Sequence, residues 1–267
     1  MRILNEKYSI SDTVNEMYDD LIIQFDDKIK YAKRFNDWRT NILCSDIGAT
    51  TSYVNTKNDI NENNINFVFG RIYYPSNEEE LKFLKDNNLI YYKYIVPQRK
   101  DELCSIRLHT YYYNGDFDYN FYENLQHELN HAYQNINGLI PKNDMYDRVA
   151  DVLSNNIIND KLIKAIAYLV YCSHKFEQDS IVNGYYRRLC KNNADKIIPF
   201  RDSYKNSNYN DFLIALEIFN KATEDEKQNV YNRLKINNKN FEVKLEKSKD
   251  RFIRKMTNAY EKYLQNF

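Results

Sequence analysis

The chain has 267 residues, and its 38 basic and 38 acidic side chains give a formal net charge of zero at pH 7. This balance argues against a nucleic-acid or membrane partner, because proteins that bind such anionic surfaces usually carry a basic excess. The four cysteines are scattered without a C-x-x-C spacing, which excludes a zinc knuckle or a dithiol redox motif. No apolar run approaches the ~18 residues of a membrane span, and no signal-peptide core opens the sequence.

The first half of the sequence predicts one helix followed by a small sheet. Residues 9–35 carry apolar side chains at helical spacing, whereas residues 46–64 are polar and predict a loop. Asn77 is a capping residue for a short helix over residues 78–88. Branched and aromatic residues dominate three predicted strands, and a turn follows the last of them. These strands and the turn span residues 65–75, 89–97, 103–113 and 114–118.

The second half predicts helices only. Glycine (5) and proline (4) are scarce, which favours long helices. Because the strands are confined to the first half, the sequence predicts the α+β fold class with segregated elements. The predicted helices span residues 120–136, 144–158, 160–173, 175–190, 209–221, 224–235 and 244–265.

Residues 127–131, HELNH, form an H-E-x-x-H motif inside the predicted helix 120–136. Residues four apart lie one turn above each other on a helix, so His127 and His131 present two imidazoles to one metal ion. Glu128, one step round the helix, reaches a water on that ion without binding the metal itself. Two of the chain's four histidines fall in this motif, which favours a metal site over a helix face with incidental histidines.

A catalytic zinc site needs a third protein ligand, and two acidic residues downstream are candidates. Glu177 shares a predicted helix face with Ser180 and Gly184, and small residues there let this helix approach the motif helix closely. Asp151 stands at the distance from the second histidine where thermolysin-like enzymes place a metal-binding glutamate, although its side chain is shorter. We favour Glu177 as the third ligand and keep Asp151 as the alternative.

The chain resembles the gluzincin branch of zinc metallopeptidases, with HELNHAYQ as the active-site helix. The segment EQDSIVNGYY is similar to the later, glutamate-bearing helix of that branch. The chain is also similar to H-E-x-x-H proteins from phages and gut bacteria. Gln134 and Asn137 stand where a metzincin has a glycine and its third histidine, which excludes that branch. The resemblance covers residues 103–190.

The resemblance implies a zincin-like arrangement within the α+β class. Residues 1–137 would hold the N-terminal helix, a small sheet and the active-site helix beneath it. Residues 138–267 would form a helical lobe that supplies the third metal ligand, and the two parts would make one catalytic unit. The implied cofactor is Zn²⁺, and the expected location is the cytoplasm or a virion.

The implied activity is that of a peptidase. Glu128 acts as general base on a zinc-activated water that attacks a peptide or protein substrate. A non-catalytic structural or host-interaction protein on the same scaffold, such as a virion component, is the alternative. Four further side chains are candidate oxyanion or cleft groups: His109, His174, Tyr185 and Tyr186.

Overall fold

The computed structural model describes residues 12–54, 63–95, 105–136, 144–154, 158–192 and 196–267. The chain divides into two units, Met1–Asn137 and Gly138–Phe267. All strands of the described residues lie in the first unit, and the second unit contains helices, so the fold is α+β as predicted. None of the helices in the described ranges combines the length and the apolar content that a membrane crossing requires.

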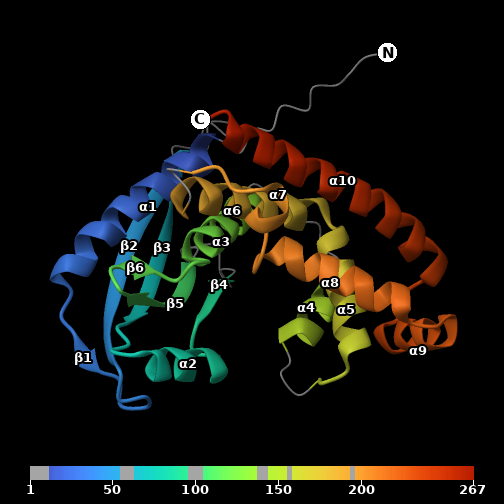
Figure 1. Ribbon diagram of the computed structural model, residues 1–267, viewed down its shortest axis with the longest axis horizontal. Coiled ribbons are helices and arrows are strands. Elements are labelled where there is room, and N and C mark those ends of the chain that lie inside the picture. Colours follow the sequence, from blue (N-terminus) through green and yellow to red (C-terminus); the bar gives the residue numbers. More distant parts are fainter. Residues whose placement is uncertain (1–11, 55–62, 96–104, 137–143, 155–157, 193–195) are drawn as a thin grey trace. The chain divides into compact units, whose positions relative to one another are not determined.

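The first unit is built on a sheet with the strand order β1-β2-β3-β5-β4, and β6 pairs with β5 (Figure 1). Neighbouring strands are antiparallel, except for the parallel pair β3 and β5. Strand β4 is therefore an edge strand. The elements are α1 (Asp12–Tyr31), β1 (Phe35–Asn36), β2 (Leu43–Val54), β3 (Asn63–Tyr73), α2 (Glu78–Asp86), β4 (Tyr91–Ile95), β5 (Ser105–Tyr113), β6 (Asp116–Phe117) and α3 (Phe121–Ile136).

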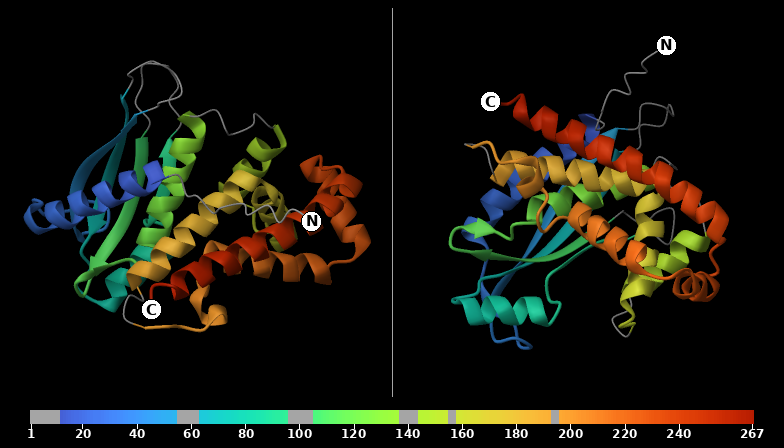
Figure 2. Two further views of the ribbon diagram at one scale, coloured as in Figure 1. Left: turned by 90° about the horizontal axis from the view of Figure 1, so that it is seen from above. Right: turned by 45° about the vertical axis from the view of Figure 1, so that its right-hand side comes forward.

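The two faces of this sheet have different covers, because successive side chains of a strand point to opposite sides. Helices α1 and α3 contact each other and pack on one face, where Ile106 and Leu108 are fully buried (Figure 2, left). A Cβ atom on Gly70 would lie 2.9 Å from the Leu108 side chain and 3.3 Å from that of Phe25, so glycine permits the close approach of α1. Helix α2 packs on the opposite face, against Tyr73.

The predicted loop over residues 46–64 is wrong where the structure describes it. Strand β2 runs through residues 46–54 and pairs with β3 from Cys44 opposite Tyr73 to Val54 opposite Asn63. Ile47 and Ala49 are buried under α1, and this tertiary burial outweighs the polar, strand-poor local composition. Residues 55–62 of the predicted loop lie outside the described residues.

The predicted helices of the second unit are present, although their ends differ from the prediction and one further short helix, α7, occurs. Helix α10 begins earlier than predicted because the Asn237 side chain caps it, accepting a hydrogen bond from the Asn240 N–H at 3.3 Å. The short α7 was not predicted. The elements are α4 (Asp144–Ser154), α5 (Lys161–Ser173), α6 (Lys175–Asn192), α7 (Phe200–Ser203), α8 (Asn208–Lys221), α9 (Glu224–Leu234) and α10 (Asn238–Leu264).

The start of α6 is held by a buried polar cluster in the second unit. The Gln178 amide donates to the Ser248 hydroxyl at 2.7 Å, and the Arg251 guanidinium donates to Gln178 Oε1 at 2.7 Å. Helix α6 thereby packs against α10 as well as α5. This packing fixes the first turn of α6, in which Glu177 is fully buried.

Candidate metal centre

Helix α3 presents the two histidines of the motif. Phe121 and Leu125 anchor it in the core of the first unit with no exposed surface. His127 and His131 follow one turn apart, and their Nε2 atoms lie 2.9 Å from each other. Their rings are nearly perpendicular, at 86°, and both side chains are buried. The two ring nitrogens therefore converge on one point.

The spacing of this pair fits a tetrahedral metal ion. Two imidazole nitrogens at ~2.05 Å from zinc and at the tetrahedral angle lie about 3.3 Å apart. The observed separation of 2.9 Å between the Nε2 atoms of His127 and His131 is close to that value. The two nitrogens are within hydrogen-bonding distance of each other, so a bound ion would replace that hydrogen bond.

Glu128 lies at the outer edge of the sheet. Its side chain is half-buried, and its Oε2 atom accepts a hydrogen bond from the Tyr94 N–H at 2.7 Å. Tyr94 stands opposite Ile106 of β5, and in an antiparallel pair the N–H groups of alternate residues point away from the partner strand. The carboxylate of Glu128 is thus fixed at the free edge of β4.

A second hydrogen bond ties α3 to the same strand. The Asn135 side chain donates to the Tyr94 hydroxyl at 3.0 Å. Tyr94 therefore contacts α3 through its backbone N–H at Glu128 and through its hydroxyl at Asn135. Neither contact follows from the motif alone, because Tyr94 is separated from α3 by the whole of β5.

Glu177 is held within the second unit by an aromatic cluster. The Tyr146 hydroxyl of α4 donates to Glu177 Oε1, and the Tyr146 ring stacks on Tyr171 at 5.4 Å between centroids. The His174 ring contacts Tyr146 edge-on at 5.2 Å. Burial lowers the pKa of His174, and the nearby Glu177 carboxylate opposes this shift. His174 is therefore a neighbour of Glu177 in this cluster.

His127, His131 and Glu177 form a candidate metal site. Each is buried and offers one ligand atom, and these atoms lie within 4.8 Å of one another. It is the one such group of three or more histidine, cysteine or acidic side chains in the described ranges. Two imidazoles and one carboxylate suit several divalent ions, zinc among them.

The structure places the other predicted residues as follows. Asp151 is exposed on α4. Tyr185 is fully buried, and its hydroxyl shares a hydrogen bond with the Ser203 hydroxyl within the second unit. Burial raises the pKa of Tyr186, and the Lys262 ammonium lies 5.0 Å above its ring. These two tyrosines thus have packing contacts of their own.

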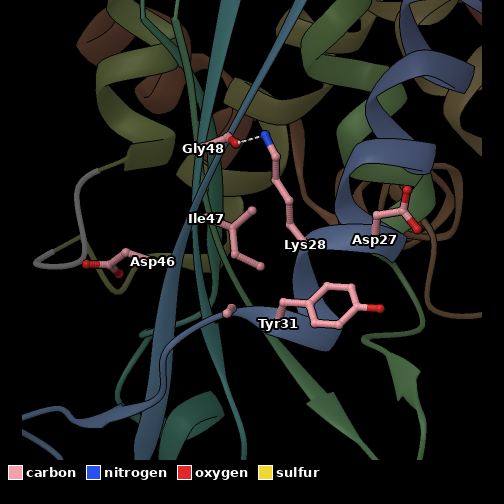
Figure 3. Close-up of a pocket in the computed structure, with 7 residues that line it drawn as sticks. Asp27, Lys28, Tyr31, Asp46, Ile47 and Gly48 are labelled. Carbon is pink, nitrogen blue, oxygen red and sulfur yellow. Dashed lines mark hydrogen bonds between the residues drawn. The ribbon is translucent and has the colours of Figure 1, made fainter.

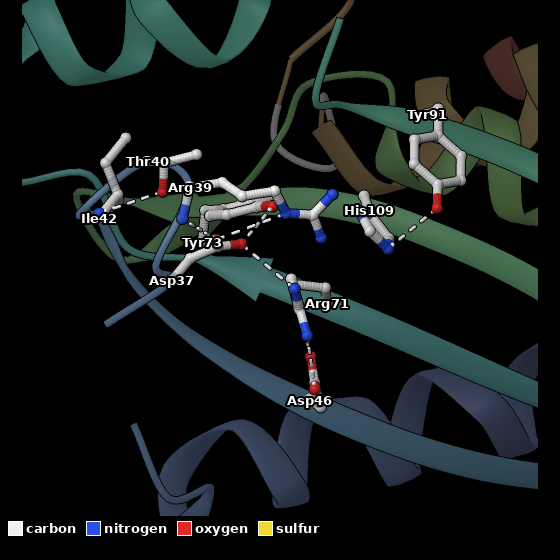
Figure 4. A network of polar contacts seen from close by, with 9 residues as sticks. All are labelled: Asp37, Arg39, Thr40, Ile42, Asp46, Arg71, Tyr73, Tyr91 and His109. Carbon is white, nitrogen blue, oxygen red and sulfur yellow. Dashed lines mark hydrogen bonds and ion pairs between the residues drawn. The ribbon is translucent and has the colours of Figure 1, made fainter. Parts of the chain in front are cut away.

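His109 lies on the sheet face opposite α3, in a row of polar side chains that crosses four strands (Figure 4). Its Nε2 atom lies 3.0 Å from the Tyr91 hydroxyl. Beside it, Arg71 donates to Asp46 at 2.7 Å and to Asp37 at 3.2 Å. Burial, with a contribution from the Arg71 charge, lowers the pKa of His109 to about 4. His109 is therefore neutral near pH 7.

A pocket of about 350 Å³ lies in the first unit between the end of α1 and β2. Lys28 and Tyr31 line it, and the Lys28 ammonium donates to the Gly48 carbonyl (Figure 3). None of the three candidate metal ligands lines this pocket.

No protein-family model, curated protein or solved structure matches the chain. The candidate site therefore rests on its own geometry. The sequence does not predict two hydrogen bonds at these residues: the Tyr146 hydroxyl donates to Glu177, and the Tyr94 N–H donates to Glu128. Both join residues about thirty positions apart, and no local pattern distinguishes these two tyrosines among the 25 of the chain.

Proposed function

We propose that the chain is a zinc-dependent metallohydrolase that cleaves peptide bonds. The observation that carries the proposal is the buried group of His127, His131 and Glu177, whose ligand atoms lie within 4.8 Å of one another. Two converging imidazoles and one carboxylate are a ligand set of catalytic zinc sites.

The number of ligands supports a catalytic rather than a structural ion. Structural zinc sites are closed by four protein ligands, whereas catalytic sites have three and leave one position open. The candidate group of the described residues has three members. When bound, zinc supplies Lewis acidity, which polarises a carbonyl and lowers the pKa of a water toward ~7.

Glu128 is the proposed general base. Its carboxylate follows His127 directly on α3 and is held in place by the Tyr94 N–H. It takes a proton from the attacking water and delivers it to the leaving amine nitrogen. The Tyr94 hydrogen bond at Oε2 holds this carboxylate in position beside His127.

The proposed substrate is a peptide in an extended conformation along the outer edge of β4. An edge strand offers alternate N–H and C=O groups to an added strand. The Tyr94 N–H points away from β5, and backbone groups of alternate residues in a strand point to the same side. The N–H and C=O groups of Tyr92, two residues earlier, therefore also face this edge. The scissile bond would then lie beside Glu128.

Glu177 is the proposed third ligand. Its full burial, with a hydrogen bond from Tyr146 at Oε1, orients the carboxylate in the way that hydrogen-bonded partners orient metal ligands. Asp151 is exposed on α4, which makes it the weaker candidate.

A zinc and peptidase assay on the full chain tests the function. Purified protein should carry zinc, hydrolyse an unstructured protein such as casein, lose activity with a chelator and regain it with zinc. Glu128→Gln should keep the zinc and lose at least 99% of the rate, on the order of 10²-fold or more. Glu79→Gln, on the exposed face of α2, is the matched control. Zinc binding without any hydrolysis would favour the non-catalytic alternative.

The third ligand is tested by zinc affinity. Glu177→Ala should weaken zinc binding well beyond the 10–100-fold typical of a residue that only orients a ligand. Asp151→Ala should leave the affinity unchanged. Release of zinc by Asp151→Ala, with retention by Glu177→Ala, would reverse the assignment.

A further inference from the structure

The β1–β2 hairpin of the first unit projects apolar side chains into solvent. Trp38, the single tryptophan of the chain, is 87% exposed in the turn. Phe35 and Leu43, on the two strands of the hairpin, are 39% and 43% exposed. We call residues 33–43 the tip. Isolated exposed apolar residues are ordinary on a protein surface, but three within one hairpin are a local concentration.

The apolar side chains of the tip point in different directions. Phe35 pairs with Cys44 and Asn36 pairs with Leu43, so Phe35 and Leu43 lie on opposite faces of the hairpin. Trp38 lies in the turn that joins the two strands, and the Arg39 guanidinium is 5.5 Å from the centroid of its ring. A flat protein surface covers one face of such a hairpin, whereas an interface of lipid headgroups and acyl chains surrounds it from all sides.

The charge around the tip is basic although the whole chain is neutral. The tip, residues 33–43, contains three basic residues and one acidic one, Asp37. Asp37 is buried and already bound by Arg71 at 3.2 Å. Two further basic residues precede the tip: the Lys28 ammonium donates to the Gly48 carbonyl at the pocket of Figure 3, and Lys30 pairs with Asp27 at 3.4 Å. The exposed basic side chains on the tip are Lys33, Arg34 and Arg39. The Arg34 guanidinium lies 4.1 Å from the centroid of the Tyr74 ring, and Arg39 lies 3.9 Å from Asp37.

The turn that carries Trp38 is firmly ordered by its own hydrogen bonds. The Asp37 carbonyl accepts from the Asn41 N–H at 2.7 Å, and the Asp37 N–H donates to the Ile42 carbonyl at 3.0 Å. The Asp37 carboxylate accepts from the Arg39 N–H at 2.8 Å and from the Tyr73 hydroxyl at 3.2 Å (Figure 4). A preorganised turn loses little conformational entropy when it binds.

From these observations we infer that the tip docks the protein on an anionic lipid surface. Trp38 and Phe35 enter the headgroup region, where tryptophan is favoured because its ring is apolar and its N–H is polar. Lys33, Arg34 and Arg39 contact the lipid phosphates, each contributing about fivefold in affinity. The zero net charge predicted no membrane partner, but it averages over the whole chain and conceals this local excess. The inference is independent of the metal site.

The single tryptophan makes the inference directly measurable. Full-length protein is titrated with phosphatidylcholine vesicles that contain phosphatidylglycerol, and with vesicles of phosphatidylcholine alone. The anionic vesicles should shift Trp38 emission to the blue, and brominated lipid should quench it. Emission that is unchanged by the anionic vesicles would overturn the inference, as would a shift of equal size with the neutral vesicles.

Two matched double variants distinguish binding through the tip from a general effect of the protein's charge. Lys33→Gln combined with Arg34→Gln should weaken vesicle binding about 25-fold, from about fivefold per charge. Lys247→Gln combined with Arg254→Gln removes the same two charges from exposed positions on α10 and should have no effect. Equal losses for the two pairs would contradict a role for the tip. Tighter binding of a single-stranded oligonucleotide than of anionic vesicles would assign the tip to nucleic acid and overturn the lipid proposal.

Discussion

The two faces of the sheet in the first unit are built by different interactions. The face under α1 and α3 is apolar, with Ile72, Ile106 and Leu108 fully buried. The opposite face carries a row in which Arg71 and His109 occupy neighbouring strands and interact with acidic and aromatic side chains (Figure 4). The apolar face positions helix α3, which bears His127 and His131, whereas the polar row stabilises the hairpin that bears Trp38. The two faces should therefore respond differently to substitution and to pH.

The largest effect is expected on the apolar face. Phe121 is fully buried, stacks on Phe117 with ring centroids 4.2 Å apart and meets Phe25 edge-on at 5.8 Å. Phe121→Ala should lower the free energy of unfolding by about 3–5 kcal/mol, measured by urea denaturation. Phe83→Ala, at a 43% exposed position on α2, should change it by less than about 0.5 kcal/mol. If both substitutions lowered the free energy of unfolding equally, Phe121 would contribute no more to stability than an exposed residue, which would contradict this account.

A smaller loss is expected from the polar row. Arg71→Leu removes two hydrogen bonds to Asp46 and one to Asp37, at 2.7, 2.8 and 3.2 Å. The loss should be about 2 kcal/mol, because charged hydrogen bonds contribute more than neutral ones and Asp37 stays buried. Lys221→Leu breaks only an exposed ion pair with Glu217 and should be nearly neutral. If Arg71→Leu left the free energy of unfolding unchanged, the polar row would have no role in stability.

The smallest effect is a pH dependence carried by His109. Burial lowers the pKa of His109 from 6.5 to about 4, so between these values the unfolded chain binds more protons than the folded one. His109 therefore contributes stability that is complete above pH 6.5 and is lost as the pH falls toward 4. His109→Gln, which retains a hydrogen-bonding partner for Tyr91, should flatten this part of the curve. The free energy of unfolding of the wild-type and variant proteins is compared at the same pH values, with a chelator present in both. Parallel curves would contradict the assignment to His109.

The elements that the sequence predicts well are those in which local pattern and tertiary packing agree. Helix α3 carries apolar residues at helical spacing, and the two histidines of its motif lie four positions apart, so their convergence follows from helix geometry alone. Strand β2 was missed because Gly48 and its polar neighbours disfavour a strand locally. Its formation depends on pairing with β3 and on cover from α1, neither of which is a local property.

The partners of the site were beyond the reach of sequence patterns. The Tyr94 N–H meets Glu128 because β4 is the edge strand, and this follows from the strand order rather than from spacing. The Tyr146 hydroxyl meets Glu177 across two helices of the second unit. In both cases the fold, and not the local sequence, determines which of the many tyrosines contacts the site.

The most direct test of the proposed metal centre is zinc K-edge X-ray absorption on the full chain loaded with one equivalent of zinc. We predict nitrogen or oxygen scatterers only, at about 2.0–2.2 Å, with the outer-shell pattern of two imidazoles. His131→Ala should reduce that pattern to a single imidazole. A sulfur shell at about 2.3 Å would assign the zinc to cysteine and contradict a site built on His127, His131 and Glu177.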